Sequence, residues 1–169
     1  WVDRLAGWPM APTWTLMAVT DEVDWPWDAA EPDTGPLAWV ARNDRRPGRG
    51  GPEGCAVWVA HADLAWSRRH LEADPADVAE RLGHALQGLL PPGPLRWHHR
   101  AVHRWRYAAP LGPAPDERLA WWDEGRGLAV CGDYLGGGDA DGAWRSGDEL
   151  ADRIAAELEA VSAGSAVSR

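Results

Sequence analysis

Short apolar runs dominate the first third of the chain and predict β-strands. They cover residues 13–20, 36–43 and 55–62, each of a length typical of a strand. Turn-rich loops containing glycine, proline and acidic residues separate the runs, which favours antiparallel pairing. In the third run, alternate residues should share one face of the sheet. These residues are Ala56, Trp58 and Ala60 on one side, and Cys55, Val57 and Val59 on the other.

Helical spacing replaces this pattern between residues 75 and 90. Asp74 is a favourable N-cap, Pro75 suits the first helical position, and Asp77 stabilises the first turn. The prolines of residues 91–94 end the helix. Its apolar face is predicted to consist of Val78, Leu82, Leu86 and Leu89.

A strict alternation then covers residues 95–110 and predicts one long strand. The two faces consist of Trp97, His99, Ala101, His103, Trp105 and Tyr107, and of His98, Arg100, Val102, Arg104 and Arg106. The three histidines invite a metal-site interpretation, but no carboxylate or cysteine is interleaved with them. We therefore predict no metal ion here.

The C-terminal third combines strands with a helix. Residues 118–133 predict two short strands around a turn at 124–127. Ser146 and Glu149 have the spacing of a capping box, which predicts that a helix begins at this point. The apolar stripe of that helix is Leu150, Ile154, Leu158 and Val161.

The segment between this strand and this helix has the residue types of a ligand-binding turn. Asp133 directly follows the strand, and its carboxylate suits the hydroxyl groups of a sugar or polyol. Gly142 and Ala143 would let a ligand approach backbone amides at the positive end of the helix. Asp141 stands where a dinucleotide fingerprint needs its third glycine. From these residues, a polyol or anion site and an ordinary glycine-rich turn are equally open interpretations.

Composition narrows the possible classes of protein. The chain has 169 residues, of which 45% are hydrophobic, as expected of a globular domain. Its net charge of -9 argues against nucleic-acid binding. All 17 basic residues are arginine, which excludes a Schiff-base lysine and a phosphate-loop lysine. We interpret the 13 tryptophans and the absence of phenylalanine as a compositional bias.

The cysteines and the N-terminus bear on the location of the protein. Cys55 and Cys131 are the only cysteines, and no stretch has the form of an export signal or a membrane span. We therefore expect reduced thiols and a cytoplasmic protein. The first residue is not methionine, which suggests that the natural start lies upstream.

Four pieces of the chain, taken in order, carry a resemblance to a known family. They are residues 11–19 (APTWTLMAV), 35–49 (GPLAWVARNDRRPGR), 65–82 (AWSRRHLEADPADVAERL), and 103–110 (HRWRYAAP) followed by 129–147 (AVCGDYLGGGDADGAWRSG). Together they resemble the C-terminal half of the renalase-like bacterial flavin oxidoreductases, within the wider amine oxidase family. The combination is specific, and it covers nearly the whole chain.

The resemblance implies an α+β fold and FAD as the cofactor. It implies a mixed, mostly antiparallel substrate-domain sheet with helices, and a C-terminal strand and helix that complete an α/β FAD-binding domain. The corresponding boundaries are 1–110 for part of the substrate domain, 111–163 for part of the FAD-binding domain and 164–169 for a tail. The implied activity is oxidation of an amine or a reduced nicotinamide-type substrate by hydride transfer to the flavin, with oxygen or another acceptor reoxidising it.

The resemblance also places the cofactor on particular residues. Gly132 and Asp133 would contact the sugar-like chain of FAD or its phosphate end. Gly142, Ala143 and Trp144 would border the pyrimidine edge of the flavin ring. No catalytic residue is implied, because members of this family often need no protein acid or base for hydride transfer.

A small-molecule substrate would need a pocket of its own. Trp39, Trp105 and Tyr107 are candidates for an aromatic wall of that pocket, although core packing is the commoner fate of such side chains. Ser67 and Ser146 lack the context of a nucleophile elbow, which argues against hydrolase chemistry.

The sequence departs from the family pattern in two respects. Asp141 stands where the family usually has glutamate, and the neighbouring Asp139 adds charge that would repel a pyrophosphate. The N-terminal βαβ unit with its glycine fingerprint is also missing. We therefore expect a fragment whose partner is the missing N-terminal FAD-binding half, on the same or another chain. The alternative is a stand-alone, non-catalytic binding module that has lost that half.

Overall fold

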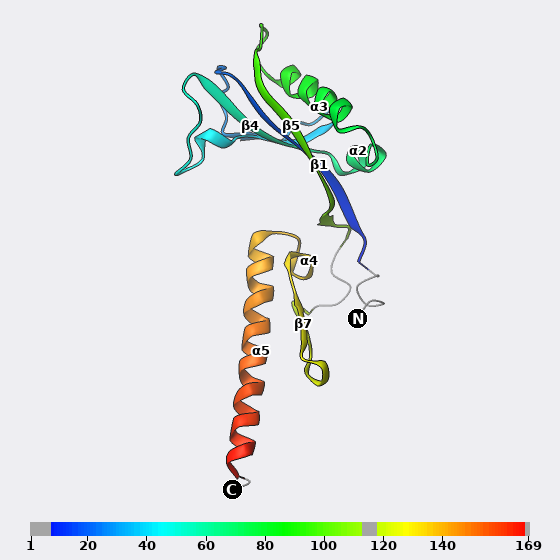
Figure 1. Cartoon of the computed structure of the whole chain (residues 1–169), viewed down its shortest axis with the longest axis vertical. Helices are drawn as coiled ribbons and strands as arrows, with labels where there is room; N and C mark the ends of the chain where they lie inside the picture. The colour runs from blue at the N-terminus through cyan, green and yellow to red at the C-terminus, as the bar shows by residue number, and fades with distance from the viewer. Residues whose placement is uncertain (1–7, 113–117, 168–169) are drawn as a thin grey trace. The chain divides into compact units, whose positions relative to one another are not determined.

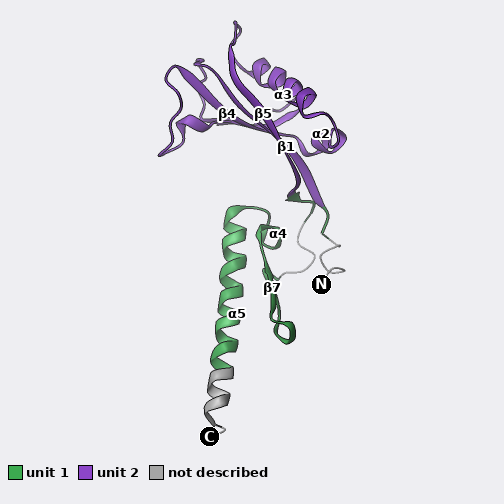
Figure 2. Ribbon diagram, viewed as in Figure 1, with its two compact units in different colours: residues 1–9, 109–169 green, residues 10–108 purple. Residues whose placement is uncertain are grey.

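The computed structural model describes residues 8–112 and 118–167, with side chains as far as residue 160, and it divides the chain into two compact units (Figure 2). The first, here called the sheet unit, comprises residues 10–108. The second, the hairpin–helix unit, comprises the described parts of residues 1–9 and 109–169. Each unit has its own buried cluster.

The sheet unit is built on one five-stranded antiparallel sheet in the order β2-β3-β4-β1-β5 (Figure 1). In β1 and β4, Thr15 lies opposite His61 and Val19 opposite Val57. β5 is an edge strand beside β1, where Asp21 N–H donates to the Arg96 carbonyl oxygen over 3.1 Å. The strands are β1 (Met10–Asp21), β2 (Ala29–Ala30), β3 (Leu37–Arg42), β4 (Cys55–Ala62) and β5 (Trp97–Pro110), the last of which ends with Ala109 and Pro110 in the second unit.

Two helices, α2 (Leu64–Arg69) and α3 (Pro75–Leu89), lie on one face of this sheet (Figure 1). The Asp63 carboxylate caps α2 by accepting from Trp66 N–H, and the Asp74 carboxylate caps α3 by accepting from Ala76 N–H. A short 3-10 turn, η1 (Asn43–Arg45), follows β3. The face of the sheet that carries the helices is called the covered face below, and the opposite one the open face.

The core of the sheet unit lies between the covered face and α3. Trp58 is fully buried, and its indole N–H donates to the Thr20 hydroxyl over 2.9 Å. Burying such residues removes apolar area from water and is the main source of stability. The buried cluster consists of Trp14, Leu16, Ala18, Trp25, Leu37, Val40, Ala56, Trp58, Ala60, Ala62, Val78, Leu82, Leu86 and Leu90.

Most of the predicted elements of this unit are confirmed. The strand at residues 55–62 and the helix that begins at Pro75 occur with the expected bounds, and the expected faces of both are buried. The strict alternation predicted for β5 is wrong at its start. Trp97 and Arg100 were expected on opposite faces, but Trp97 packs against the core, and the Arg100 guanidinium carbon lies 5.3 Å from the centre of the Trp97 ring. The apolar periodicity also gave no prediction of the short helix α2.

The hairpin–helix unit consists of a two-stranded antiparallel sheet followed by two helices. Its buried cluster contains Trp8, Trp121 and Leu135, with the rings of Trp8 and Trp121 4.8 Å apart. The elements are β6 (Ala120–Asp123), η2 (Glu124–Arg126), β7 (Leu128–Cys131), α4 (Asp133–Gly136) and α5 (Ala140–Val167).

The predicted α+β class is confirmed, as is the pair of strands around residues 124–127. The capping box predicted at Ser146 and Glu149 is wrong, because α5 begins at Ala140 and Ser146 is a buried residue within it. The physical reason is that Asp139 is the cap, with its carboxylate accepting from Gly142 N–H over 2.7 Å. Leu150 and Ile154, on the predicted apolar stripe, are only half-buried.

Candidate functional site

The Gly132-Asp133 turn follows directly on the end of β7. Gly132 is the N-terminal flanking residue of α4, and its N–H donates to the Ser146 hydroxyl over 2.9 Å. The same hydroxyl donates to the Leu119 carbonyl oxygen. Ser146 therefore fixes the turn against α5, which is a structural role that its place inside the helix allows.

Asp133 is the first residue of α4, and its side chain is half-buried. Its backbone carbonyl accepts from Gly138 N–H over 2.8 Å, which closes the turn beneath it. Burial raises the pKa of the neighbouring Tyr134 phenol, and electrostatic interactions with Cys131 and Asp133 raise it further. The turn thus presents the partly accessible carboxyl group of Asp133 beside the Tyr134 phenol, whose hydroxyl group stays protonated near neutral pH.

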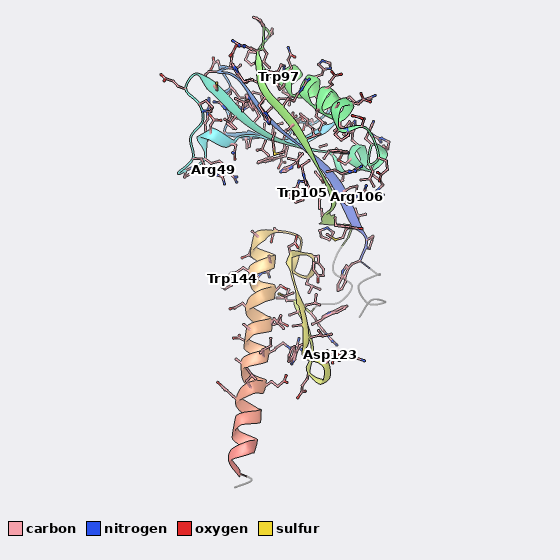
Figure 3. All side chains as sticks on the ribbon, in the orientation of Figure 1. Arg49, Trp97, Trp105, Arg106, Asp123 and Trp144 are labelled. Atoms are coloured by element: carbon pink, nitrogen blue, oxygen red, sulfur yellow. The ribbon has the colours of Figure 1, made fainter. Side chains whose placement is uncertain are left out.

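The glycines of this segment let α4 and α5 approach closely. A Cβ atom on Gly142 would lie 2.4 Å from the Gly136 carbonyl oxygen, closer than any real contact allows. Gly142 is accordingly buried, and its N–H is already taken by Asp139. The bare backbone that we expected a ligand to approach at Gly142 is therefore occupied by the chain itself. Ala143 is half-buried, and Trp144 is 67% exposed (Figure 3).

A hollow of about 430 Å³ in the sheet unit is lined by residues of β1, β3, β4, β5 and α2. Its wall includes Trp105 and Tyr107 of β5, which are 52% and 79% exposed. The neighbouring Arg106, labelled with Trp105 in Figure 3, does not line this hollow. Its guanidinium donates to the Glu72 carboxylate over 2.7 Å. This cavity, called the aromatic hollow below, is lined by Thr13, Ala38, His61, Ala62, Leu64, Trp105, Tyr107 and Ala108.

His61 is the polar residue around which the aromatic hollow is organised. Its Nδ1 atom lies 2.9 Å from the Thr15 hydroxyl, and its ring stacks on Trp39 with the ring centres 5.1 Å apart. Burial lowers the pKa of His61, so that the imidazole is neutral at pH 7. Since Nδ1 is engaged by Thr15, Nε2 is the nitrogen left for a ligand in the hollow.

A second hollow of about 210 Å³ lies along β3 and the loop that follows it. Trp39 and the arginines 42, 45 and 46 contribute to its wall. Arg42 is 2% exposed and binds the carboxylates of both Glu22 and Asp44 at 2.7–3.0 Å. Burial alone would raise the pKa of Asp44, but hydrogen bonds from Arg42 and from Val57 N–H hold it below its ordinary value. Because Arg42 is buried and bound to two carboxylates of the protein itself, its role is structural.

The structure brings the predicted site residues together in two groups. Trp105 and Tyr107 line the aromatic hollow, and Trp39 borders it through its stacking on His61. The cofactor candidates Gly132, Asp133, Gly142, Ala143 and Trp144 gather where β7, α4 and the start of α5 meet.

Sequence reasoning did not find His61, Thr13 or Thr15. The signal was present, because His61 follows Val57 and Val59 on the face of its strand that turns away from Trp58. A histidine on such an apolar strand face can be identified as a candidate site residue only when the residues opposite it on the neighbouring strands are known. Among the described residues, no group of three metal-ligating side chains occurs, and His98 binds Asp21 at 2.7 Å.

No protein-family model matches the chain. In the part of the chain that the structure describes, no helix is both long enough and apolar enough to cross a membrane.

Proposed function

We propose that the chain is the C-terminal portion of an FAD-dependent oxidoreductase of the renalase-like type. The observation that carries the proposal is the Gly132-Asp133 turn at the end of β7, which presents a half-buried carboxylate before the start of α5. When bound, FAD would accept a hydride equivalent from an amine or a reduced nicotinamide-type substrate. The implied compartment is the cytoplasm, and the implied partner is a dinucleotide-binding half.

The residues at this turn fit one part of FAD better than another. An ionised Asp133 accepts hydrogen bonds from hydroxyl groups, as the ribityl chain of a flavin offers. Asp139 and Asp141 add negative charge to the same segment, and a pyrophosphate would be repelled there. We therefore assign the ribityl chain and the ring to this chain, and the pyrophosphate to the dinucleotide-binding half.

In this proposal Gly142 does not contact the flavin, but it has a structural role. Its packing against Gly136 holds the start of α5 close to the Asp133 turn. Ala143 and Trp144 follow it, and the Trp144 indole is a large exposed apolar surface on which a planar ring can stack. The chain's own residues would thus bind the hydroxyls and cover one edge of the ring.

Titration of the intact chain with riboflavin, FMN and FAD tests this assignment through the flavin fluorescence. The three flavins are expected to bind within about threefold of one another, because the chain contacts only the part that they share. Asp133→Asn is expected to weaken binding about tenfold or more, as removal of a charged hydrogen-bond partner does. Asp152→Asn removes the same charge from an exposed position of α5 and should leave the affinity unchanged.

Two results would overturn the proposal. One is a chain that changes the fluorescence of none of the three flavins. The other is an Asp133→Asn variant that binds them as well as the Asp152→Asn variant does. Either result favours the non-catalytic binding module, for which the aromatic hollow within the compact sheet unit is the supporting observation.

A further inference from the structure

The arginine-rich turn that follows β3 has no part in the proposed function. Arg42, Arg45, Arg46 and Arg49 lie close together in a chain whose net charge is -9. The hollow of about 210 Å³ beside this turn, called the arginine hollow below, is lined by the first three of them. It lies within the sheet unit and shares no lining residue with the aromatic hollow, so the two are separate sites.

The turn beside the arginine hollow is held in place by the protein itself. The Asp44 carboxylate accepts from Val57 N–H over 2.9 Å, which ties the start of the turn to β4. Further along, Arg49 N–H donates to the Arg46 carbonyl oxygen over 3.0 Å, and Gly48 has a φ of 74°, as in a type II turn. A backbone that is already ordered lowers the entropic cost of binding a ligand.

The arginines of the hollow differ in how many of their donors are already used. Arg42 is fully engaged by two carboxylates. Arg45 donates through Nη1 to the Trp25 carbonyl oxygen over 2.7 Å, whereas its Nη2 is 3.7 Å from Glu22 Oε1, too far for a hydrogen bond. The exposed Arg46 side chain makes no hydrogen bond or ion pair within the described residues. Two guanidinium groups with free donors suit an anion that has several oxygens.

One acidic side chain, that of Asp28, lies on the same lining and makes the site selective. Its carboxylate is exposed, and within the described part of the chain it forms no ion pair with Arg45 or Arg46. An ionised carboxylate repels an anion that has only unprotonated oxygens, but it accepts a hydrogen bond from an oxygen that carries a proton. Inorganic phosphate carries a P–OH group near neutral pH, whereas sulfate carries no proton.

We propose that the arginine hollow binds inorganic phosphate and selects its protonated form, hydrogenphosphate. Arg45 and Arg46 donate to the unprotonated oxygens, and Asp28 accepts from the P–OH group. Since the hollow is open to solvent, binding is expected to weaken as the salt concentration rises.

Phosphorus NMR of the intact chain without flavin tests this site, with inorganic phosphate as the probe at about pH 7.5. Phosphate is expected to bind about fivefold or more tightly than methyl phosphate, and than sulfate measured as a competitor. Sulfate offers no proton to Asp28. Methyl phosphate has lost its own at this pH, because the second pKa of a phosphate monoester is about 6.

Two variants and their matched controls test the residues. Arg46→Gln should weaken phosphate binding about tenfold, and Arg81→Gln, which removes the same charge from an exposed position of α3, should leave it unchanged. Asp28→Asn should abolish the preference for phosphate over sulfate, because an amide also donates to an unprotonated oxygen. Asp24→Asn removes the same charge outside the lining and should keep the preference.

All four of these side chains are exposed, so the variants should keep the thermal midpoint of the wild type. The proposal fails if the chain leaves the phosphate signal unchanged, or if sulfate or methyl phosphate binds as well as phosphate. It fails equally if Arg46→Gln has no greater effect than Arg81→Gln. Because flavin is absent, failure here is distinct from failure of the proposed oxidoreductase function.

Discussion

The two units differ in how far they cover their own apolar side chains. The sheet unit buries a continuous cluster between its sheet and α3. Six of the larger side chains in this cluster have 0% exposure, namely Leu16, Val40, Trp58, Val78, Leu82 and Leu86. The hairpin–helix unit has a small cluster around Trp8, Trp121 and Leu135, while Leu128 and Leu158 are 50% and 62% exposed.

This contrast has a consequence for stability. Protein stability is a small difference between burial and conformational entropy, so a unit with a small core depends more on close backbone contacts and hydrogen bonds. In the hairpin–helix unit these include the Gly136–Gly142 contact and the two hydrogen bonds of Ser146. Variants in the two units should therefore differ in both size and kind of effect.

The largest effect is expected in the core of the sheet unit. Trp58→Ala should lower the free energy of unfolding by about 3–5 kcal/mol, because it leaves a cavity and removes the hydrogen bond to Thr20. Urea denaturation followed by circular dichroism measures this loss. Trp27→Ala removes the same side chain from a 56% exposed position and should cost less than half as much. Equal losses would contradict the assigned core.

Effects of intermediate size on stability, one destabilising and one stabilising, are expected at two glycines of α5. Gly142→Ala should destabilise the hairpin–helix unit by about 1–3 kcal/mol, because the new methyl group meets the Gly136 carbonyl. Gly147→Ala adds the same methyl group where nothing lies within 4 Å and should stabilise the helix by about 0.5–1 kcal/mol. Hydrogen exchange resolved by peptide compares the two variants within residues 120–160. A stabilising Gly142→Ala would rule out the described contact.

The smallest effect is a pH dependence in the aromatic hollow. Burial lowers the pKa of His61 below its ordinary value of 6.5, so the unfolded chain takes up this proton first as the pH falls. The contribution of His61 is therefore complete above pH 6.5 and declines as the pH falls below that value. The difference in thermal midpoint between wild type and His61→Gln, measured across this range, should shrink toward acid pH. A difference that grows toward acid pH would mean that the folded state favours the charged imidazole.

The sequence predicted the sheet unit well because its elements follow their own periodicity. In β4 every second residue is buried, and in α3 the buried residues recur at helical spacing behind the Asp74 cap. Trp97 was misplaced because its environment depends on Arg100 and Gly83, which local alternation does not include.

The hairpin–helix unit was harder to predict from sequence. Ser146 and Glu149 match a capping box, yet the Asp139-x-x-Gly142 start lies earlier in the chain and Ser146 is used for tertiary hydrogen bonds. The role of Gly142 was likewise missed, because a close approach of two backbone segments leaves no periodic signal. His61 became a candidate only when strand pairing placed it beside Thr15 and Trp39.

The measurement that tests the central claim most directly is hydrogen exchange of the intact chain with and without FAD. If the Asp133 turn receives the ribityl chain and the ring, FAD should slow exchange in residues 132–144 and leave α3 unchanged, and Asp133→Asn should reduce that slowing. An unchanged rate in residues 132–144 at FAD concentrations that saturate the fluorescence signal would contradict the assignment.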